Sequence, residues 1–106
     1  MSGRRLGPVD PAAYTPGQQR LAARANAGPR TRLGAPLSVM LHSPGVADPL
    51  EQLSEYVRFR SAIPKRIKEL VILIVARHWA APYPWSRHYE AALAAGIDAG
   101  AAAQIA

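Results

Sequence analysis

The chain has 106 residues, the length of one small domain, and 49% of them are hydrophobic, which excludes a largely disordered chain. It contains no cysteine, and this excludes disulfides, thiolate metal sites and thiol redox chemistry. No run of 18 apolar residues occurs, and no apolar stretch follows the basic N-terminus. We therefore expect neither a membrane span nor a secretory signal, and we place the protein in the cytoplasm.

The net charge of +6 is concentrated in the first 47 residues. This segment carries six arginines against one aspartate: Arg4, Arg5, Arg20, Arg24, Arg30, Arg32 and Asp10. Tyr14 is its only aromatic residue, whereas surfaces that bind single-stranded nucleic acid combine basic with aromatic side chains. We therefore expect solvated charge and no nucleic-acid binding, and a module that binds another anionic partner stays open.

The N-terminal half predicts an arm followed by short helices. Residues 1–14 are rich in glycine and proline, so we expect an extended arm. A capping box with Thr15 as N-cap and Gln18 at the third position predicts a helix over residues 16–27. The apolar residues 36–42 predict one or two further helical turns.

A second capping box is predicted at Asp48, with Glu51 at the third position, and it opens a helix over residues 49–60. The large apolar residues of this helix fall on one stripe: Leu50, Leu53 and Val57.

Residues 64–80 predict a central helix that Pro64 opens. Residues 70–76 are apolar on every side, which also permits a buried strand, but the length of the segment and a Lys65–Glu69 pair at i,i+4 favour a helix. A helix that is apolar all round is central to a bundle or buried in a subunit contact.

The C-terminal part predicts a helix over residues 84–95 that Gly96 ends, and Asp98 then looks like the N-cap of a last short helix. The sequence shows no hairpin signal and no internal repeat. The predicted fold class is therefore all-α.

Two residues could carry chemistry. Glu69 precedes the apolar run, where it either faces the helix N-terminus and Lys65 or orients a histidine. His88 lies among aromatic residues that either pack beside it or wall a pocket: Tyr83, Trp85 and Tyr89. The three histidines of the chain lack the spacing of metal ligands, so we expect no metal.

Residues 58–97 resemble the carboxymuconolactone decarboxylase family of the alkylhydroperoxidase-D-like superfamily. The matching frame is Glu-Leu, an apolar run, Ala-Arg, Tyr-x-Trp-x-x-His and Ala-x-x-Ala-Gly. In this chain the frame is Glu69-Leu70, Ala76-Arg77, Tyr83, Trp85, His88 and Ala92 to Gly96. A weaker upstream match extends the resemblance over residues 4–106.

The resemblance implies an all-helical, alkylhydroperoxidase-D-like domain over residues 15–106 that assembles as trimers or hexamers and needs no cofactor. In the redox branch of the family a cysteine pair stands where this chain has Ala81 and Pro84. Without thiols a peroxidase cycle is excluded. The other branch includes the lactone decarboxylase of aromatic catabolism.

Membership of that branch implies a lyase that acts on a small carboxylated lactone, with His88 as general acid/base and Glu69 as its support. Decarboxylation needs a cation to hold the leaving carboxylate and a proton donor to quench the carbanion. The arginine candidates, in falling order, are Arg87, Arg77 and Arg58. Tyr83 and Trp85 complete the expected substrate-binding set.

The chain departs from the family pattern at two places. Pro84 replaces an acidic residue common in the family, and family members continue for several helices beyond the position of Ala106. We therefore expect a C-terminally shortened version of the domain. The alternative to an enzyme is a non-catalytic helical subunit that associates with itself or with related proteins.

Overall fold

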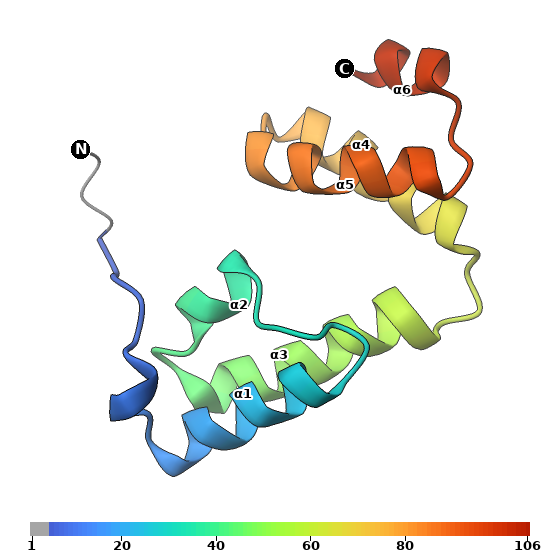
Figure 1. The fold of residues 1–106 in the computed structure, drawn as a ribbon. Helices are drawn as coiled ribbons and strands as arrows, with labels where there is room; N and C mark the ends of the chain where they lie inside the picture. The colour runs from blue at the N-terminus through green and yellow to red at the C-terminus, as the bar shows by residue number, and fades with distance from the viewer. Residues whose placement is uncertain (1–4) are drawn as a thin grey trace. The chain divides into compact units, whose positions relative to one another are not determined.

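The computed structural model describes residues 5–106, and this range is helical without any strand (Figure 1). Its helices are a 3-10 turn η1 (Pro11–Ala13), α1 (Pro16–Ala27), α2 (Ala35–Met40), α3 (Pro44–Glu55), a π-helical turn η2 (Tyr56–Arg60), α4 (Lys65–His78), α5 (Pro82–Ala94) and α6 (Ala99–Ile105). The predicted all-α class is confirmed. None of the helices in residues 5–106 is long and apolar enough to cross a membrane.

The chain divides into two compact units, with the boundary between Ser61 and Ala62. The first unit holds α1, α2 and α3, and the second holds α4, α5 and α6. Each unit has its own small core of buried apolar side chains. The single domain expected over residues 15–106 stays a prediction.

The first unit begins with the expected capping box. The backbone N–H of Gln18 donates to Oγ1 of Thr15 at 3.3 Å, and the N–H of Thr15 donates to Oε1 of Gln18 at 2.9 Å. The Gln18 side chain is also buried and donates to the carbonyl oxygen of Leu41 at 2.8 Å. One residue therefore caps α1 and ties it to the end of α2, beside the core residue Leu21.

The N-terminal arm is partly different from the prediction. Residues 1–4, including Arg4, lie outside the described residues. Pro11–Ala13 forms a 3-10 turn in place of extended chain, because Oδ1 of Asp10 accepts the N–H of Ala12 at 3.0 Å. A contact between Nε2 of His42 and the carbonyl oxygen of Gly7, at 2.8 Å, holds the arm against the unit.

The predicted start of α3 was wrong. The helix begins at Pro44, so Asp48 lies inside it and cannot act as the N-cap, and Pro49 is an internal proline. The side chain of Asp48 instead forms an ion pair with Arg24 on α1, at 2.7 Å. This tertiary contact accounts for the acidic residue that the sequence pattern assigned to a cap.

The stripe on α3 does not form the core. Leu50, Leu53 and Val57 are 40%, 62% and 48% exposed. The face that packs inside the unit carries Ala47, Glu51 and Glu55, which recur every four residues. The unit therefore buries the face of α3 that carries small and charged residues, whereas the face that carries large apolar residues is exposed.

The second unit is a helical hairpin with a short third helix. α4 and α5 pack along each other, and α6 contacts α4. The predicted helices 64–80 and 84–95 are observed as Lys65–His78 and Pro82–Ala94. Gly96 ends α5 with φ +100°, and the Asp98 side chain caps α6 by accepting the N–H of Ala101, as expected.

α4 is not buried on every side within its unit. Its inward face consists of Glu69, Leu73 and Ala76, at a helical spacing of four and three. Val71 and Ile74 on the opposite face are about half exposed. The second unit alone therefore does not place α4 at the centre of a bundle, and its burial in a subunit contact, the other expected arrangement, stays a prediction.

Candidate functional site

The α4–α5 hairpin is set by a tight turn after α4. The N–H of Ala81 donates to the carbonyl of Ala76 at 2.8 Å, and the N–H of Ala80 donates to the carbonyl of Arg77 at 3.1 Å. These two bonds are those of a Schellman motif, whose C′ residue lies in the left-handed region. Ala80 occupies that position with φ +48°. The turn fixes where α5 begins and therefore which residues face α4.

Glu69 occupies the inward face of α4, one helical turn before Leu73. The residue is only 3% exposed, and Leu73 next to it is fully buried. A carboxylate at such a position needs a partner that donates hydrogen bonds. The predicted partner, Lys65, is not the one that the structure provides.

His88 lies on the face of α5 that packs against α4, three residues after Trp85 and four before the buried Ala92. Its Nδ1 lies 2.7 Å from Oε2 of Glu69. The histidine side chain is 18% exposed and the glutamate side chain 4%. The hairpin thus brings together two residues that stand nineteen positions apart in the sequence.

The chemistry of the pair follows from what each atom can do. An ionised carboxylate only accepts hydrogen bonds, so a hydrogen bond to ionised Glu69 requires the tautomer of His88 with its proton on Nδ1, and the Nδ1–H group then donates to Oε2. The length of 2.7 Å is typical of a hydrogen bond to a charged group. Nε2 is then the ring nitrogen that can accept or give up a proton, and Glu69 fixes the orientation of the ring.

The aromatic residues around His88 have different roles. Trp85 is half buried, packs on the core of the second unit and lies 6.0 Å from the ring of Tyr89. Tyr83 is 47% exposed and lies outside that core. Trp85 therefore stands one turn from His88 on the same face of α5, and an aromatic pocket that includes Tyr83 stays a prediction.

The arginines are less closely placed. Arg87 neighbours His88 in α5, and its side chain is exposed. Arg77 is exposed too, and it lies eight residues beyond Glu69, about 12 Å further along the axis of α4. Arg58 belongs to the first unit, where its guanidinium lies 4.9 Å from the ring centre of Phe59. Among the described residues, neither Arg87 nor Arg77 forms an ion pair or a hydrogen bond with Glu69 or His88.

The first unit holds a charged cluster that the sequence did not predict. Glu51 is fully buried, and its Oε2 accepts hydrogen bonds from Nε and Nη2 of Arg24 at 3.0 and 2.8 Å. Nε of Arg30 lies 3.7 Å from the other carboxylate oxygen. Burial acts to lower the pKa of Arg24, but the hydrogen bonds to Glu51 and Asp48 outweigh it and raise that pKa.

This cluster changes the interpretation of the N-terminal arginines. Arg24 and Arg30 were expected to be solvated, but both are bound to acidic residues of α3. The sequence signal was the four-residue spacing of Ala47, Glu51 and Glu55, which places two carboxylates on one helix face. The stripe of larger apolar residues on another face of the same helix masks this signal in the sequence.

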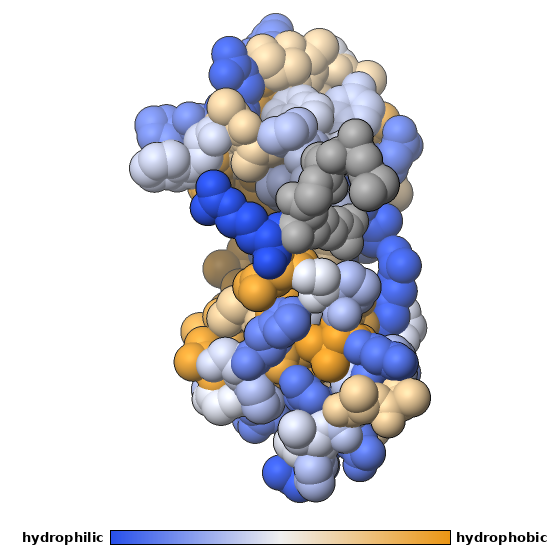
Figure 2. All heavy atoms as spheres, turned by 90° about the vertical axis from the view of Figure 1, so that its left-hand side faces the viewer, coloured by the Kyte–Doolittle hydropathy of each residue, from blue (hydrophilic) through white to orange (hydrophobic). Residues whose placement is uncertain are grey.

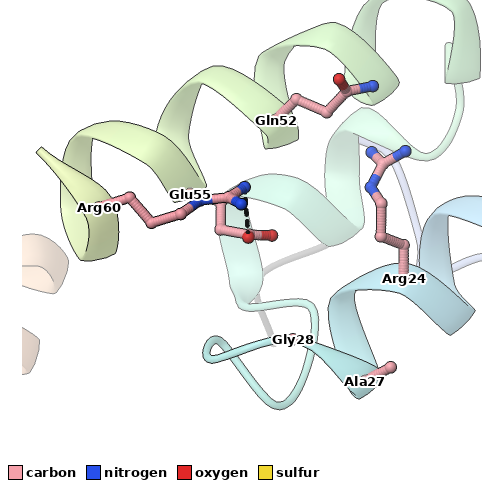
Figure 3. Close-up of a pocket in the computed structure, with 6 residues that line it drawn as sticks. All are labelled: Arg24, Ala27, Gly28, Gln52, Glu55 and Arg60. Atoms are coloured by element: carbon pink, nitrogen blue, oxygen red, sulfur yellow. Dashed lines mark ion pairs between the residues drawn. The ribbon is translucent and has the colours of Figure 1, made fainter.

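A hollow of about 560 Å³ lies beside the charged cluster, between the end of α1 and the end of α3 (Figure 3). Six residues line it: Arg24, Ala27, Gly28, Gln52, Glu55 and Arg60. The two charges drawn at one end neutralise each other, because Nη2 of Arg60 lies 2.8 Å from Oε1 of Glu55. The hollow therefore offers little net charge to a ligand.

Two further findings concern metal binding and the relation of this chain to known families. Within residues 5–106, no group of three or more histidine or acidic side chains could hold a metal ion. Comparison with models of known families, with curated proteins and with solved structures gave no match to this chain. The resemblance noted in the sequence therefore rests on its motif residues alone.

Proposed function

We propose that the protein is a carboxymuconolactone decarboxylase-like lyase that removes a carboxyl group from a small unsaturated lactone. The observation that supports this proposal is the 2.7 Å contact between the buried Glu69 carboxylate and Nδ1 of His88. Both residues are motif positions of the family that the sequence resembles. A buried carboxylate that orients a histidine is a common arrangement for acid/base catalysis.

The proposed reaction uses Nε2 of His88. The bond between the lactone ring and its carboxylate breaks, carbon dioxide leaves, and the electron pair stays on the ring as a dienolate. The imidazolium form of His88 gives the proton on Nε2 to the carbon, which quenches the dienolate. Nδ1 keeps its proton and its bond to Glu69 throughout, so Glu69 is a positioning residue and His88 is the catalytic one.

Arg87 is the proposed anchor for the carboxylate of the substrate. A guanidinium binds a carboxylate through two parallel hydrogen bonds, and Arg87 is adjacent in sequence to His88. It lies on an exposed part of α5 and makes no ion pair with another described residue. Arg77 is the second choice because it lies a further 12 Å or so from Glu69 along α4.

Spectroscopic decay assays test the proposal. Purified protein is mixed with a panel of unsaturated carboxylactones, and their ultraviolet absorbance is followed over time. We expect the wild type to convert at least one of them, and His88→Ala to lower kcat by about 10²–10⁴-fold. His78→Ala is the matched control, since this exposed histidine on α4 has no contact with Glu69. Equal conversion by wild type and His88→Ala excludes the proposed role.

A non-catalytic helical subunit is the second candidate, and the open face of α4 favours it. Val71, Ile74 and Val75 are each about half exposed, although they are β-branched apolar residues. Monomeric proteins rarely expose contiguous apolar patches of this kind. A protein that converts no member of the panel and still forms a defined assembly supports this candidate over the lyase.

A further inference from the structure

Two basic residues lie one helical turn before Glu69 on α4. Lys65 and Arg66 stand four and three positions before it, so all three residues are neighbours on one side of the helix. Long side chains of an α-helix lean toward its N-terminus, over the positions three and four residues earlier. The carboxylate of Glu69 therefore leans over the turn that carries the two cations.

Neither cation is engaged by another described residue. Glu69 bonds to Nδ1 of His88 at 2.7 Å, and the side chains of Lys65 and Arg66 form no ion pair or hydrogen bond within residues 5–106. Both residues are exposed. Hydrophilic side chains of this kind (blue) stand out from the face of the molecule drawn in Figure 2. The two charged groups are thus available to a ligand.

The side chain of Arg66 reaches from α4 toward α5. Its Cδ lies 3.8 Å from the place that a Cβ on Gly96 would occupy, just after the end of α5. Since α4 and α5 form a hairpin, the first turn of α4 lies beside the last turn of α5 (Figure 1). Lys65 and Arg66 therefore border the open end of the hairpin, the end opposite to the turn at Ala80.

No exposed carboxylate on α4 opposes these cations. Glu69 is the only acidic residue of α4, and it is buried and bound to His88. Asp98 caps α6, and Glu90 stands two positions after His88, which is about 200° round α5. An anion that approaches the open end of the hairpin therefore meets two positive charges, and such a pair raises the local concentration of anions.

We propose that Lys65 and Arg66 form a binding site for small carboxylates at the entrance to the Glu69–His88 pair. A guanidinium holds a carboxylate by two parallel hydrogen bonds, and an ammonium adds a point charge. The site begins about 6 Å from Glu69 along α4, half the distance to Arg77. That the bound carboxylates are substrates rests on the proposed lyase function, whereas their binding does not.

A titration with a small carboxylate tests the site directly. Furan-2-carboxylate is added to the ¹⁵N-labelled chain of 106 residues, and the amide shifts are followed by NMR. We expect the largest changes in the first two turns of α4 and at His88, and much smaller changes with the neutral furan-2-carboxamide. Changes of equal size with both compounds, or changes confined to the first unit, overturn the proposal.

Paired substitutions identify the residues that bind. Lys65→Gln combined with Arg66→Gln should weaken the binding of furan-2-carboxylate by about tenfold. Lys65→Arg combined with Arg66→Lys keeps both charges and should bind nearly as well as the wild type. Arg20→Gln combined with Arg32→Gln is the matched control, because these exposed arginines of the first unit remove the same charge. Undiminished binding in the Lys65/Arg66 glutamine variant, or an equal loss in the control, refutes the site.

Kinetics connect the site to turnover. With a substrate found in the decay assay, the Lys65/Arg66 glutamine variant should lower kcat/KM by about tenfold at low ionic strength, mainly through KM. The deficit should shrink as salt is added, because salt screens exposed charges. A fall in kcat alone that does not depend on salt contradicts an entry site. If no compound of the panel is converted, the lyase proposal fails, and the titration still decides whether Lys65 and Arg66 bind carboxylates.

Discussion

At the scale of single residues, the molecule buries two glutamates in different ways. Glu69 contacts one histidine, whereas Glu51 contacts two arginines and is completely shielded from solvent. A lone buried carboxylate is unfavourable, so each depends on its partners. The contact with Glu69 uses only Nδ1 of His88, so Nε2 stays available for proton transfer. The contacts with Glu51 hold Arg24 and Arg30 in structural ion pairs.

Replacing Glu51 should destabilise the first unit. Glu51→Gln removes the charge that Arg24 and Arg30 share, and we expect the free energy of unfolding to fall by roughly 2–3 kcal/mol, below the value for fully buried pairs because Arg24 is partly solvated. Chemical denaturation measures the loss. Glu90→Gln is the control, since Glu90 is exposed and the change in net charge is the same. Equal losses in the two variants contradict a structural role for Glu51.

Replacing Glu69 should impair catalysis more than folding. Glu69→Gln keeps the shape of the side chain, but its amide also donates hydrogen bonds and so permits the other tautomer of His88. With a substrate found in the decay assay, we expect kcat to fall while KM changes little, and His88→Ala to be the more damaging change. A variant with unchanged kcat shows that the carboxylate does not position the ring.

At the scale of elements, the second unit contains two Schellman motifs, one at the end of α4 and one at the end of α5, and they differ in the residue at the left-handed position. α5 ends with Gly96 in the left-handed region, where the N–H of Ile97 donates to Ala92 and that of Gly96 to Leu93. α4 ends with the same bonds, but an alanine, Ala80, stands in the left-handed position. Non-glycine residues are strained there, and the strain lies in the turn that sets the Glu69–His88 register.

Replacing Ala80 with glycine and replacing Gly96 with alanine should change the free energy of unfolding in opposite directions. We expect Ala80→Gly to raise the free energy of unfolding by about 0.5–1 kcal/mol, and Gly96→Ala to lower it by about 1–2 kcal/mol. A Cβ on Gly96 meets only Cδ of Arg66 at 3.8 Å, so the loss reflects backbone strain and not a clash. Thermal unfolding of both variants measures the effect, and a destabilising Ala80→Gly contradicts the assignment of strain.

The elements also show what the sequence could predict. Local signals predicted the caps at Thr15 and Asp98 and the terminator Gly96 correctly, because their partners lie within a few residues. Asp48 was misassigned because its partner, Arg24, is distant in sequence. Local patterns do not contain such a contact.

The candidate site was predictable in part. The resemblance placed Glu69 and His88 together, and the structure puts them in contact. The Lys65–Glu69 pair, derived from helical spacing alone, was wrong because the partly buried His88 binds the carboxylate instead. Glu51 was misread as a capping residue because charged residues are rarely buried and the stripe of Leu50, Leu53 and Val57 suggested the opposite face.

At the scale of the whole molecule, the chain consists of two units whose cores do not share residues. Leu21 and Leu41 belong to the first core, and Leu73 and Ala92 to the second. The proposed site lies entirely in the second unit, and the charged cluster entirely in the first. The site should therefore depend on the packing of α4 and α5 and tolerate changes in the core of α1 to α3.

Hydrogen exchange can test this independence. Leu73→Ala leaves a cavity in the second core, and we expect a local loss of stability of about 2–5 kcal/mol. Amide protection should fall in α4 and α5 and stay close to the wild-type level in α1 and α3. Leu21→Ala should show the reverse pattern. Loss of protection throughout the chain in both variants indicates one cooperative domain.

The proposed site requires the hydrogen bond between Glu69 and His88 to exist in solution, and nitrogen NMR of the histidine ring measures it directly. Spectra of protein with ¹⁵N-labelled histidine separate the protonated from the unprotonated ring nitrogens. We predict that Nδ1 of His88 carries a proton in the wild type and that Glu69→Ala shifts the ring toward the tautomer protonated at Nε2. A wild-type His88 protonated only at Nε2, with no response to Glu69→Ala, contradicts the proposed site.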